Sequence, residues 1–88
     1  MKIEHREGEF SINLGREKAV LLYDTVDKTM VIHHTYTPTE FRGKGIAAKL
    51  VEESIKFAKQ KGLKIKPACS YVENYFEKNP KRKNILVD

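Results

Sequence analysis

The chain has 88 residues, 40% of them hydrophobic and 33% charged, with a formal net charge of +5 at pH 7. This length allows one domain, over residues 1–88, with a single modest core, and the chain is too apolar for a disordered tail. The only cysteine, Cys69, excludes an internal disulfide or a multi-cysteine zinc site, and no metal site is predicted. The N-terminus is too charged for a signal peptide, and no apolar run approaches the ~20 residues of a membrane span. We therefore expect a cytoplasmic domain without a membrane partner.

The net charge is unevenly distributed. Residues 1–28 carry five cations against six acids, residues 29–39 carry no charge, and residues 40–88 carry twelve cations against six acids. This asymmetry favours an anionic partner for the C-terminal half, such as nucleic acid, a phosphorylated cofactor or a membrane surface. A solvated lysine-rich face explains the same charges equally well.

Three antiparallel strands are predicted before residue 38. Apolar and polar residues alternate in residues 10–14, residues 18–26 are apolar enough to be covered on both faces, and residues 29–37 are rich in β-branched and aromatic side chains. Strict alternation in the third segment predicts four side chains on one face: Met30, Ile32, His34 and Tyr36. The breaks between these segments are long enough only for hairpin turns, and Pro38 ends the third strand.

Helical periodicity follows, from about residue 43 to residue 61. One face carries small and apolar side chains, and the opposite face is charged. The side chains predicted to face the core are Ala47, Leu50, Val51, Ser54, Phe57 and Ala58. Gly62 has the position of the glycine that ends a helix.

A short strand and a second helix are predicted next. The strand covers residues 63–66, and Ser70 and Glu73 have the spacing of a capping box that starts a helix, which Pro80 ends. The tail, residues 84–87, could add one more short strand. The order is β-β-β-α-β-α, which predicts an α+β fold with a mixed sheet.

Residues 42–47 read RGKGIA and stand directly before the first predicted helix. The first four amides of a helix have no intrahelical acceptor, and the peptide dipoles add about half a positive charge there. Because glycine lets another molecule approach the backbone closely, this segment is a candidate phosphate site, with Arg42 and Lys44 adding charge. Its small residues are Gly43, Gly45, Ala47 and Ala48. A glycine-rich turn without a ligand is the simpler interpretation of the same residues.

Three phosphate-binding motifs compete for this segment. The Walker A loop, G-x-x-x-x-G-K-[ST], has no match. The dinucleotide fingerprint G-x-G-x-x-[G/A] is met by Gly43, Gly45 and Ala48, but residues 63–67 lack the acidic residue expected about 20 positions later. The third motif, [Q/R]-x-x-G-x-[G/A], matches residues 42–47.

The third motif is the pyrophosphate-binding signature of the GNAT acetyltransferases, and the chain resembles them beyond it. The segments HTYTP (34–38), RGKGIA (42–47), PACSYV (67–72) and NP (79–80) together are similar to a small stand-alone GNAT-like family, which resembles a GNAT trimmed to its acyl-CoA-binding half. The resemblance covers roughly residues 8–82 and implies a minimal GNAT-like fold. It also implies an acetyl-CoA-dependent N-acetyltransferase whose acceptor is an unidentified primary amine of a protein, a polyamine or a small molecule.

The resemblance also implies where the cofactor binds. In GNAT folds the strand before the pyrophosphate loop separates from the strand after the helix, and acyl-CoA lies between them. Separated strands leave unpaired amides and carbonyls, which the amide-rich pantetheine arm can satisfy. The implied cofactor-binding residues are Thr35, Tyr36, Thr37, Arg42, Gly43, Lys44, Gly45, Ile46 and Ala47.

The acceptor site is expected to be open. The small family lacks the helices that shape the acceptor pocket in ordinary GNATs, and here only residues 15–17 separate the first two predicted strands. A flexible, extended or macromolecular amine suits such a site better than a buried small one.

Cys69 and His34 match positions that attract attention in the relatives, and they are the candidate catalytic residues. Cys69 precedes a predicted helix N-terminus, which lowers a thiol pKa, so it could carry the acetyl group as a thioester or merely line the pocket. An inert buried cysteine is at least as consistent with the sequence. His34 could deprotonate the incoming ammonium, although a hydrogen-bonded strand histidine fits equally well. Alternation places His33 on the opposite face, as the weaker candidate.

Other interpretations stay open. The chain could bind acyl-CoA without turnover, because a fold supplies binding without proving chemistry. A nucleic-acid-binding module agrees with the basic C-terminal half and with the KNPKRK run at 78–83, but no RRM-type aromatic motif or recognition-helix pattern supports it. Tyr71 and Tyr75 are expected first as packing residues and second as contacts to the thioester or adenine end.

Overall fold

The computed structural model describes residues 2–87. It contains five strands, β1 (Ile3–Arg6), β2 (Glu9–Asn13), β3 (Lys18–Val26), β4 (Thr29–Tyr36) and β5 (Lys64–Pro67). The helical elements are α1 (Ile46–Lys61), α2 (Ser70–Lys78) and two 3-10 segments, η1 (Thr39–Phe41) and η2 (Pro80–Ile85). None of the helices in residues 2–87 is long and apolar enough to cross a membrane.

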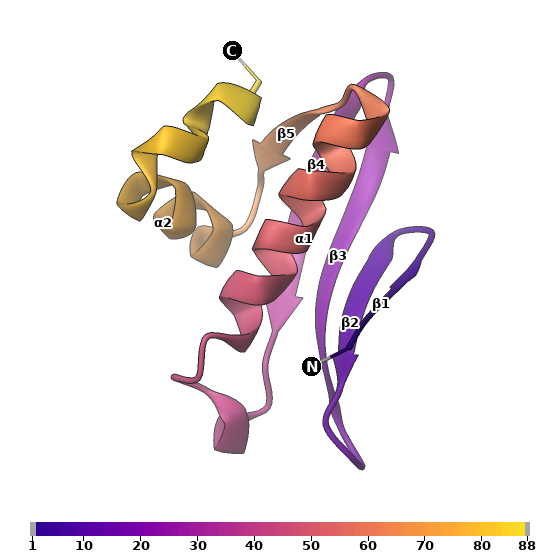
Figure 1. Ribbon diagram of the computed structural model, residues 1–88, viewed down its shortest axis with the longest axis vertical. Coiled ribbons are helices and arrows are strands. Elements are labelled where there is room, and N and C mark those ends of the chain that lie inside the picture. Colours follow the sequence, from indigo (N-terminus) through magenta and orange to yellow (C-terminus); the bar gives the residue numbers. More distant parts are fainter. Residues whose placement is uncertain (1, 88) are drawn as a thin grey trace.

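The five strands form one mixed sheet in the order β1-β2-β3-β4-β5. The first four are antiparallel neighbours, and β5 joins β4 in parallel after the α1 crossover. Helix α1 lies along one face of this sheet, and α2 with η2 lies beside β5 (Figure 1). The α+β fold with a mixed sheet, predicted from the sequence, is therefore confirmed.

Strand β1 is an addition to the predicted order. It pairs with β2 from Ile3 opposite Ile12 to Arg6 opposite Glu9. This strand was not predicted, because the segment IEHR has one aliphatic residue among three polar ones. In the structure His5 acts as an apolar residue, since its ring stacks on Phe10 with 3.9 Å between centroids.

A β-bulge in β4 changes which side chains share a face. Leu22 pairs with His34, but the next residue of β3, Tyr23, pairs with Ile32, so His33 is the extra residue. A bulge shifts the alternation of every residue after it. The prediction that His34 and Tyr36 share a face with Met30 and Ile32 is therefore wrong.

Beyond the bulge, Thr35 lies opposite the buried Leu21 and faces the helix-covered side of the sheet. His34 lies opposite Leu22 and Tyr36 opposite Val20, so both side chains point to the other face. His33 contacts Asp24, whose neighbour Tyr23 is buried on the helix side, so His33 also reaches that other face. The expected separation of His33 from His34 is a second error with the same cause.

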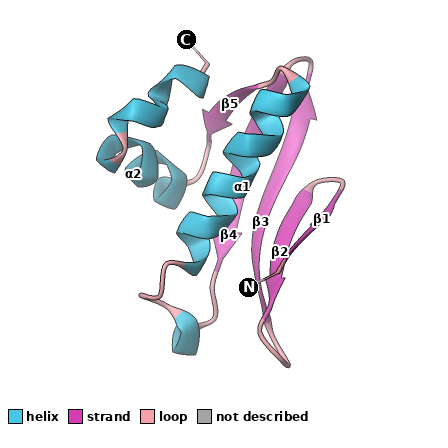
Figure 2. Ribbon diagram, in the orientation of Figure 1, coloured by secondary structure: helices cyan, strands magenta, loops and turns pink. Residues whose placement is uncertain are grey.

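Helix α1 buries one stripe against the sheet: Ile46, Leu50, Val51, Ser54, Ile55 and Ala58. Gly62 ends the helix in the left-handed conformation with φ 69°, as predicted. The first helical residue is Ile46, three positions later than expected, because both glycines before it are left-handed, Gly43 with φ 78° and Gly45 with φ 77° (Figure 2).

The C-terminal elements differ from the prediction in two details. Cys69 is the N-cap of α2 and Ser70 is already helical, with no side-chain cap hydrogen bond, so the predicted capping box does not form. The expected terminal strand is reduced to one parallel bridge between Ile65 and Leu86, because η2 occupies most of the segment. Ile85, at the end of η2, is buried in the core.

Candidate functional site

Strands β4 and β5 separate after a short parallel stretch. Their pairing runs from Thr29 opposite Lys64 to Ile32 opposite Pro67, and the last hydrogen bond joins the Ala68 amide to the Ile32 carbonyl at 2.8 Å. The bulge begins at the next residue, where a bulge bends a strand away from its neighbour. Residues 33–36 of β4 therefore have no strand partner on the β5 side (Figure 1). This separation is the one implied by the resemblance to GNAT proteins.

The start of α1 offers a second set of free backbone groups. Within residues 2–87, the amides of residues 43–48 donate no well-formed hydrogen bond to a backbone or side-chain acceptor. Gly45, the N-cap, has no side chain to cap the helix, and the first turn contains no acidic residue. A side-chain carbon added at Gly43 or Gly45 would meet nothing within 4 Å. The helix dipole and these amides are open to an anion.

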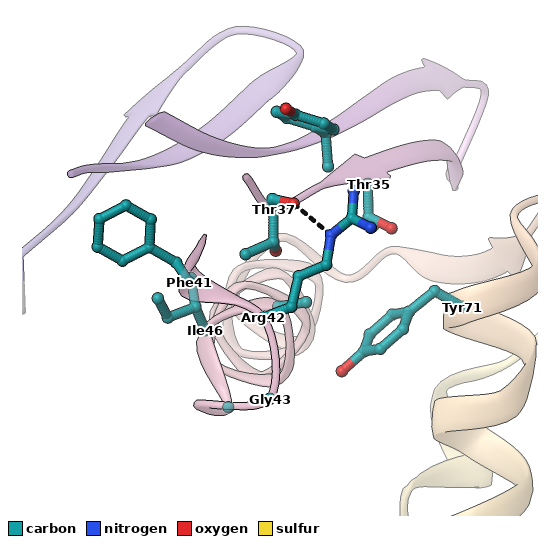
Figure 3. Close-up of a pocket in the computed structure, with 10 residues that line it drawn as sticks. Thr35, Thr37, Phe41, Arg42, Gly43, Ile46 and Tyr71 are labelled. Atoms are coloured by element: carbon teal, nitrogen blue, oxygen red, sulfur yellow. Dashed lines mark hydrogen bonds between the residues drawn. The ribbon is translucent and has the colours of Figure 1, made fainter. Parts of the chain in front are cut away.

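A cavity of about 410 Å³ joins the two sets of free groups. Figure 3 shows it bounded by the end of β4, the start of α1 and the Tyr71 side chain from α2. Its lining residues are Thr35, Tyr36, Thr37, Phe41, Arg42, Gly43, Gly45, Ile46, Ala47 and Tyr71. Of the predicted cofactor-binding residues, all except Lys44 line it.

Phe41 and Tyr71 add apolar surface to the cavity. The sequence analysis assigned no role to Phe41, although an aromatic residue directly before a glycine-rich motif is a usable signal. Tyr71 was expected first as packing, but its side chain reaches the cavity and is 39% exposed. Partial burial raises the pKa of Tyr71, so the phenol keeps its proton at neutral pH.

Arg42 lies across the mouth of this cavity. Its Nε donates a 2.8 Å hydrogen bond to the Thr37 carbonyl, and Figure 3 shows the guanidinium between β4 and Tyr71. The side chain thus crosses from the loop to the unpaired edge of β4.

Cys69 lies where β4 and β5 separate. Its Sγ is 3.5 Å from the Thr35 hydroxyl, and the residue is half-buried. Burial alone would raise the pKa of the thiol, but hydrogen bonds from Thr35 and from the backbone of Val72 and Tyr71 at the start of α2 outweigh it, so the pKa falls. The predicted position of Cys69 at a helix N-terminus is confirmed. The pKa of its thiol lies below that of a cysteine in solution.

His34 and Cys69 lie on different sides of the sheet. His34 is exposed on the face away from α1, whereas Cys69 contacts Thr35, which faces α1. His33 is held by Asp24, with 3.4 Å between Nε2 and Oδ2. The two candidate catalytic side chains therefore do not form a hydrogen-bonded pair.

An aromatic cluster at the other end of α1 has no counterpart in the predictions. His5 stacks on Phe10, meets Phe57 edge-on with 4.5 Å between centroids, and hydrogen-bonds the Tyr23 hydroxyl through Nε2 at 2.6 Å. We call these four residues the aromatic cluster. It joins β1, β2, β3 and α1 and closes that end of the sheet. Across residues 2–87, no three His, Cys, Asp or Glu side chains converge as metal ligands would.

Comparison with known proteins agrees with this fold. A family model described as GCN5-related N-acetyl-transferase matches residues 9–85. The chain therefore belongs to the GCN5-related N-acetyltransferase family, whose members generally use acetyl-CoA.

Named relatives cover most of the chain. Protein NATD1 of Xenopus tropicalis is 36% identical over 85 residues, which are 91% of this chain and 78% of that protein. Protein NATD1 of Homo sapiens is 35% identical over 91% of this chain and 75% of that protein. The solution structure of a Staphylococcus aureus protein described as GCN5-like superposes with a TM-score of 0.81 at 27% identity, covering 98% of this chain and 87% of the other.

Proposed function

We propose that this chain binds acetyl-CoA in the 410 Å³ cavity and transfers the acetyl group to a primary amine. The observation that carries the proposal is that one cavity lies between the amides of residues 43–48 and the β4 edge at residues 33–36, which has no strand partner on the β5 side. Backbone groups without partners favour a ligand that can pair with them, and coenzyme A carries both a diphosphate and a chain of amides.

The amides of residues 43–47 would hold the diphosphate. An anion at a helix N-terminus gains from the free N–H groups and from the roughly half positive charge of the dipole. The Arg42 guanidinium lies beside them, and Lys44 is exposed on the same loop. Gly43 and Gly45 support this role, since their open Cβ positions leave room for phosphate oxygens.

The β4 edge would hold the pantetheine arm. The Thr35 backbone contacts Cys69, and the carbonyl of Thr37, the residue after β4, accepts a hydrogen bond from Arg42. Both residues line the cavity. Thr35, Tyr36 and Thr37 are therefore proposed as pantetheine contacts, with Phe41 and Ile46 supplying apolar walls.

Bound acetyl-CoA would supply the acetyl group as an activated thioester. Cys69, with its lowered pKa, is proposed to attack the acetyl carbonyl as a thiolate and release the thiolate of coenzyme A. The amine then attacks the Cys69 thioester, the Cys69 thiolate leaves, and the amine proton passes to the base. The proposed base is His34, which is exposed on the face of the sheet away from α1 and would take the proton from the amine before the amine reaches Cys69 on the α1 side. No helix stands between β2 and β3, which leaves that approach open to an extended or macromolecular amine.

Two alternatives have less support. Acyl-CoA binding without turnover would need the same cavity but would not need the lowered pKa of Cys69. Nucleic-acid binding through residues 78–83 is weakened by ion pairs, since Arg82 bonds Glu52 at 2.7 Å and Lys83 bonds Glu77 at 3.0 Å.

An amide-shift titration of isotope-labelled protein tests the binding proposal. Acetyl-CoA should move the signals of residues 35–37 and 43–47, while the turn glycine Gly15 serves as a control outside the cavity. No shift at millimolar ligand would contradict the proposal.

The route through Cys69 has a separate test. Intact-mass analysis after exposure to acetyl-CoA should show one added acetyl group, absent in Cys69→Ala. Unmodified wild-type protein, together with undiminished transfer to an amine panel by the variant, would favour direct transfer with Cys69 as a lining residue.

A further inference from the structure

The two outer edges of the sheet differ in how the fold covers them. The outer edge of β5 is covered, because Leu86 forms a bridge with Ile65 and the Val87 amide donates a 3.0 Å hydrogen bond to the Ile65 carbonyl. The outer edge of β1 has no strand beside it in residues 2–87 (Figure 1). An uncovered edge strand presents free backbone groups with which another strand can pair.

The backbone groups that point outward from β1 belong to Ile3 and His5. The Tyr23 amide donates a 3.0 Å hydrogen bond to the carbonyl of Gly8, directly before β2, so the even-numbered positions along β2 bond toward β3. Because bonding direction alternates along an antiparallel strand, the odd-numbered positions of β2 bond toward β1. Their partners are the even-numbered residues of β1, which therefore turn their backbone groups inward. The odd-numbered residues of β1 turn theirs to solvent.

The charges on this edge complement themselves when two copies pair antiparallel about His5. Glu4 and Arg6 are both exposed on the face away from α1, since His5 between them lies opposite the buried Phe10. In that register, Glu4 of each copy lies directly opposite Arg6 of the other, with about 4.5 Å between Cα atoms. The two neighbouring registers that keep the same outward groups bonded put Glu4 opposite Glu4 or Arg6 opposite Arg6. Charge on an edge strand normally discourages pairing, but here it selects one register.

The helix side of the same edge has apolar surface that pairing would bury. Ile3 is half-buried at the margin of the core, and the His5 ring stacks on Phe10. Phe57 from α1 meets the His5 ring edge-on and is also half-buried. Directly opposite residues of paired strands point to the same face, so these groups from two copies would meet on the α1 side of a shared sheet.

We propose that β1 is an edge for self-association, through which two copies of this chain join antiparallel into one continuous sheet. Two Glu4–Arg6 pairs fix the register, and the outward groups of Ile3 and His5 supply hydrogen bonds. The paired segment is short, so the buried area falls below the roughly 1,200–2,000 Å² of a stable complex, and a dissociation constant on the order of 100 μM is expected. Because β1 shares no residue with the 410 Å³ cavity, the inference is independent of the proposed function.

Charge reversal on β1 tests the proposal by sedimentation velocity, at concentrations up to ~1 mM, which is about tenfold above the expected dissociation constant. Glu4→Arg gives an edge with two cations, and Arg6→Glu gives an edge with two carboxylates. Each variant alone then places like charges opposite one another, and its dissociation constant should rise roughly tenfold. An equimolar mixture of the two variants again places opposite charges across the pair, so dimers should return. The control Lys66→Glu reverses an exposed charge on β5 and should leave association unchanged.

Recovery in the mixture is the expected signature, which a general loss of structure would not produce. A wild type that stays monomeric at the highest concentration overturns the inference. Association that neither variant weakens also overturns it, because the contact would then lie elsewhere on the molecule. A mixture that associates no better than its folded components, as checked by circular dichroism, has the same meaning.

A dilution series of the wild type is independent of any variant and decides the matter if a variant unfolds. Between ~1 mM and ~50 μM, the amide signals of Ile3 and His5 should shift, because their N–H groups exchange a partner strand for water. The signals of Gly43 and Gly45 should stay in place. Shifts confined to other elements, or no shift at all, would mean that the β1 edges do not pair, and the inference would be wrong.

Discussion

The two ends of α1 differ in what they present: one packs side chains and the other exposes backbone amides. At its C-terminal end the aromatic cluster closes the sheet, with His5 stacked on Phe10 and Phe57 edge-on to both rings. At its N-terminal end the helix begins on two left-handed glycines, and its first amides meet no acceptor in residues 2–87. One end gains stability from side chains, and the other exposes backbone. Substitutions at the two ends should therefore separate folding from ligand binding.

The largest expected effect comes from placing a negative charge at the open end. Gly45→Asp should weaken coenzyme A binding on the order of 100-fold, because a carboxylate would stand where the diphosphate is proposed to bind. Aspartate tolerates the left-handed conformation better than most residues, so the fold should persist. Gly15→Asp is the matched control, since Gly15 also has a positive φ, 95°, and an open Cβ position. Equal affinities for the two variants, measured by titration calorimetry, would contradict the proposed diphosphate site.

Truncation at the closed end should act on stability instead. Phe57→Ala removes the ring that joins the aromatic cluster to α1, and it should lower the free energy of unfolding by about 2 kcal/mol, less than for a fully buried phenylalanine. Urea unfolding measures the change, with Lys56→Ala as the neighbouring surface control. Coenzyme A affinity of the folded variant should match the wild type. A large loss of affinity would mean that the two ends are coupled through α1.

A smaller effect is expected from Thr35→Val. Loss of the hydroxyl that contacts Sγ should raise the pKa of Cys69, because one of the bonds that favour the thiolate disappears. Alkylation of Cys69 at pH 7 should slow by about threefold, since the rate follows the thiolate fraction. The pH profile of alkylation gives the pKa directly. A profile that moves to lower pH would show that Thr35 does not stabilise the thiolate.

The smallest effect concerns pH and the closed end. Burial lowers the pKa of His5, and the carboxylate of Glu53 from α1 only partly opposes this. The folded state therefore disfavours the protonated ring, so its contribution to stability is present above pH ~6.5 and is lost as the pH falls through the lowered value. His5→Phe keeps the stacking and removes the titration. Urea midpoints between pH 7.5 and pH 5 should decline less in this variant than in the wild type, and an equal decline would exclude His5 as the cause.

Local patterns in the sequence were enough for the elements that carry strong periodicity or special backbone requirements. Four of the six predicted core residues of α1 are buried and the helix ends at Gly62, but Ile46 and Ile55 are buried too and Ala47 and Phe57 only partly. The glycine loop was found as a local motif, whereas its assignment to a cofactor came from the resemblance to GNAT proteins. These features depend on neighbours in sequence, so one chain suffices to find them.

Features that depend on partners distant in the sequence were not predictable. The bulge at His33 depends on the register between β3 and β4. No property of the segment HHTY marks the extra residue. In strand β1 the His5 ring packs against Phe10 and Phe57. This packing compensates for the polar character of the segment. The capping box failed for a similar reason, because the path of the chain out of β5 makes Cys69 the cap and places Ser70 inside the helix.

The extra residue at His33 has a consequence for how this molecule could be altered. Deleting it would restore strict alternation in β4, keep Thr35 opposite Leu21 on the helix side, and remove the bend that accompanies the separation from β5. Without this one residue, β4 could pair continuously, and its unpaired edge would be lost. The unpaired edge of β4 thus depends less on any one side chain than on one extra backbone residue in the strand.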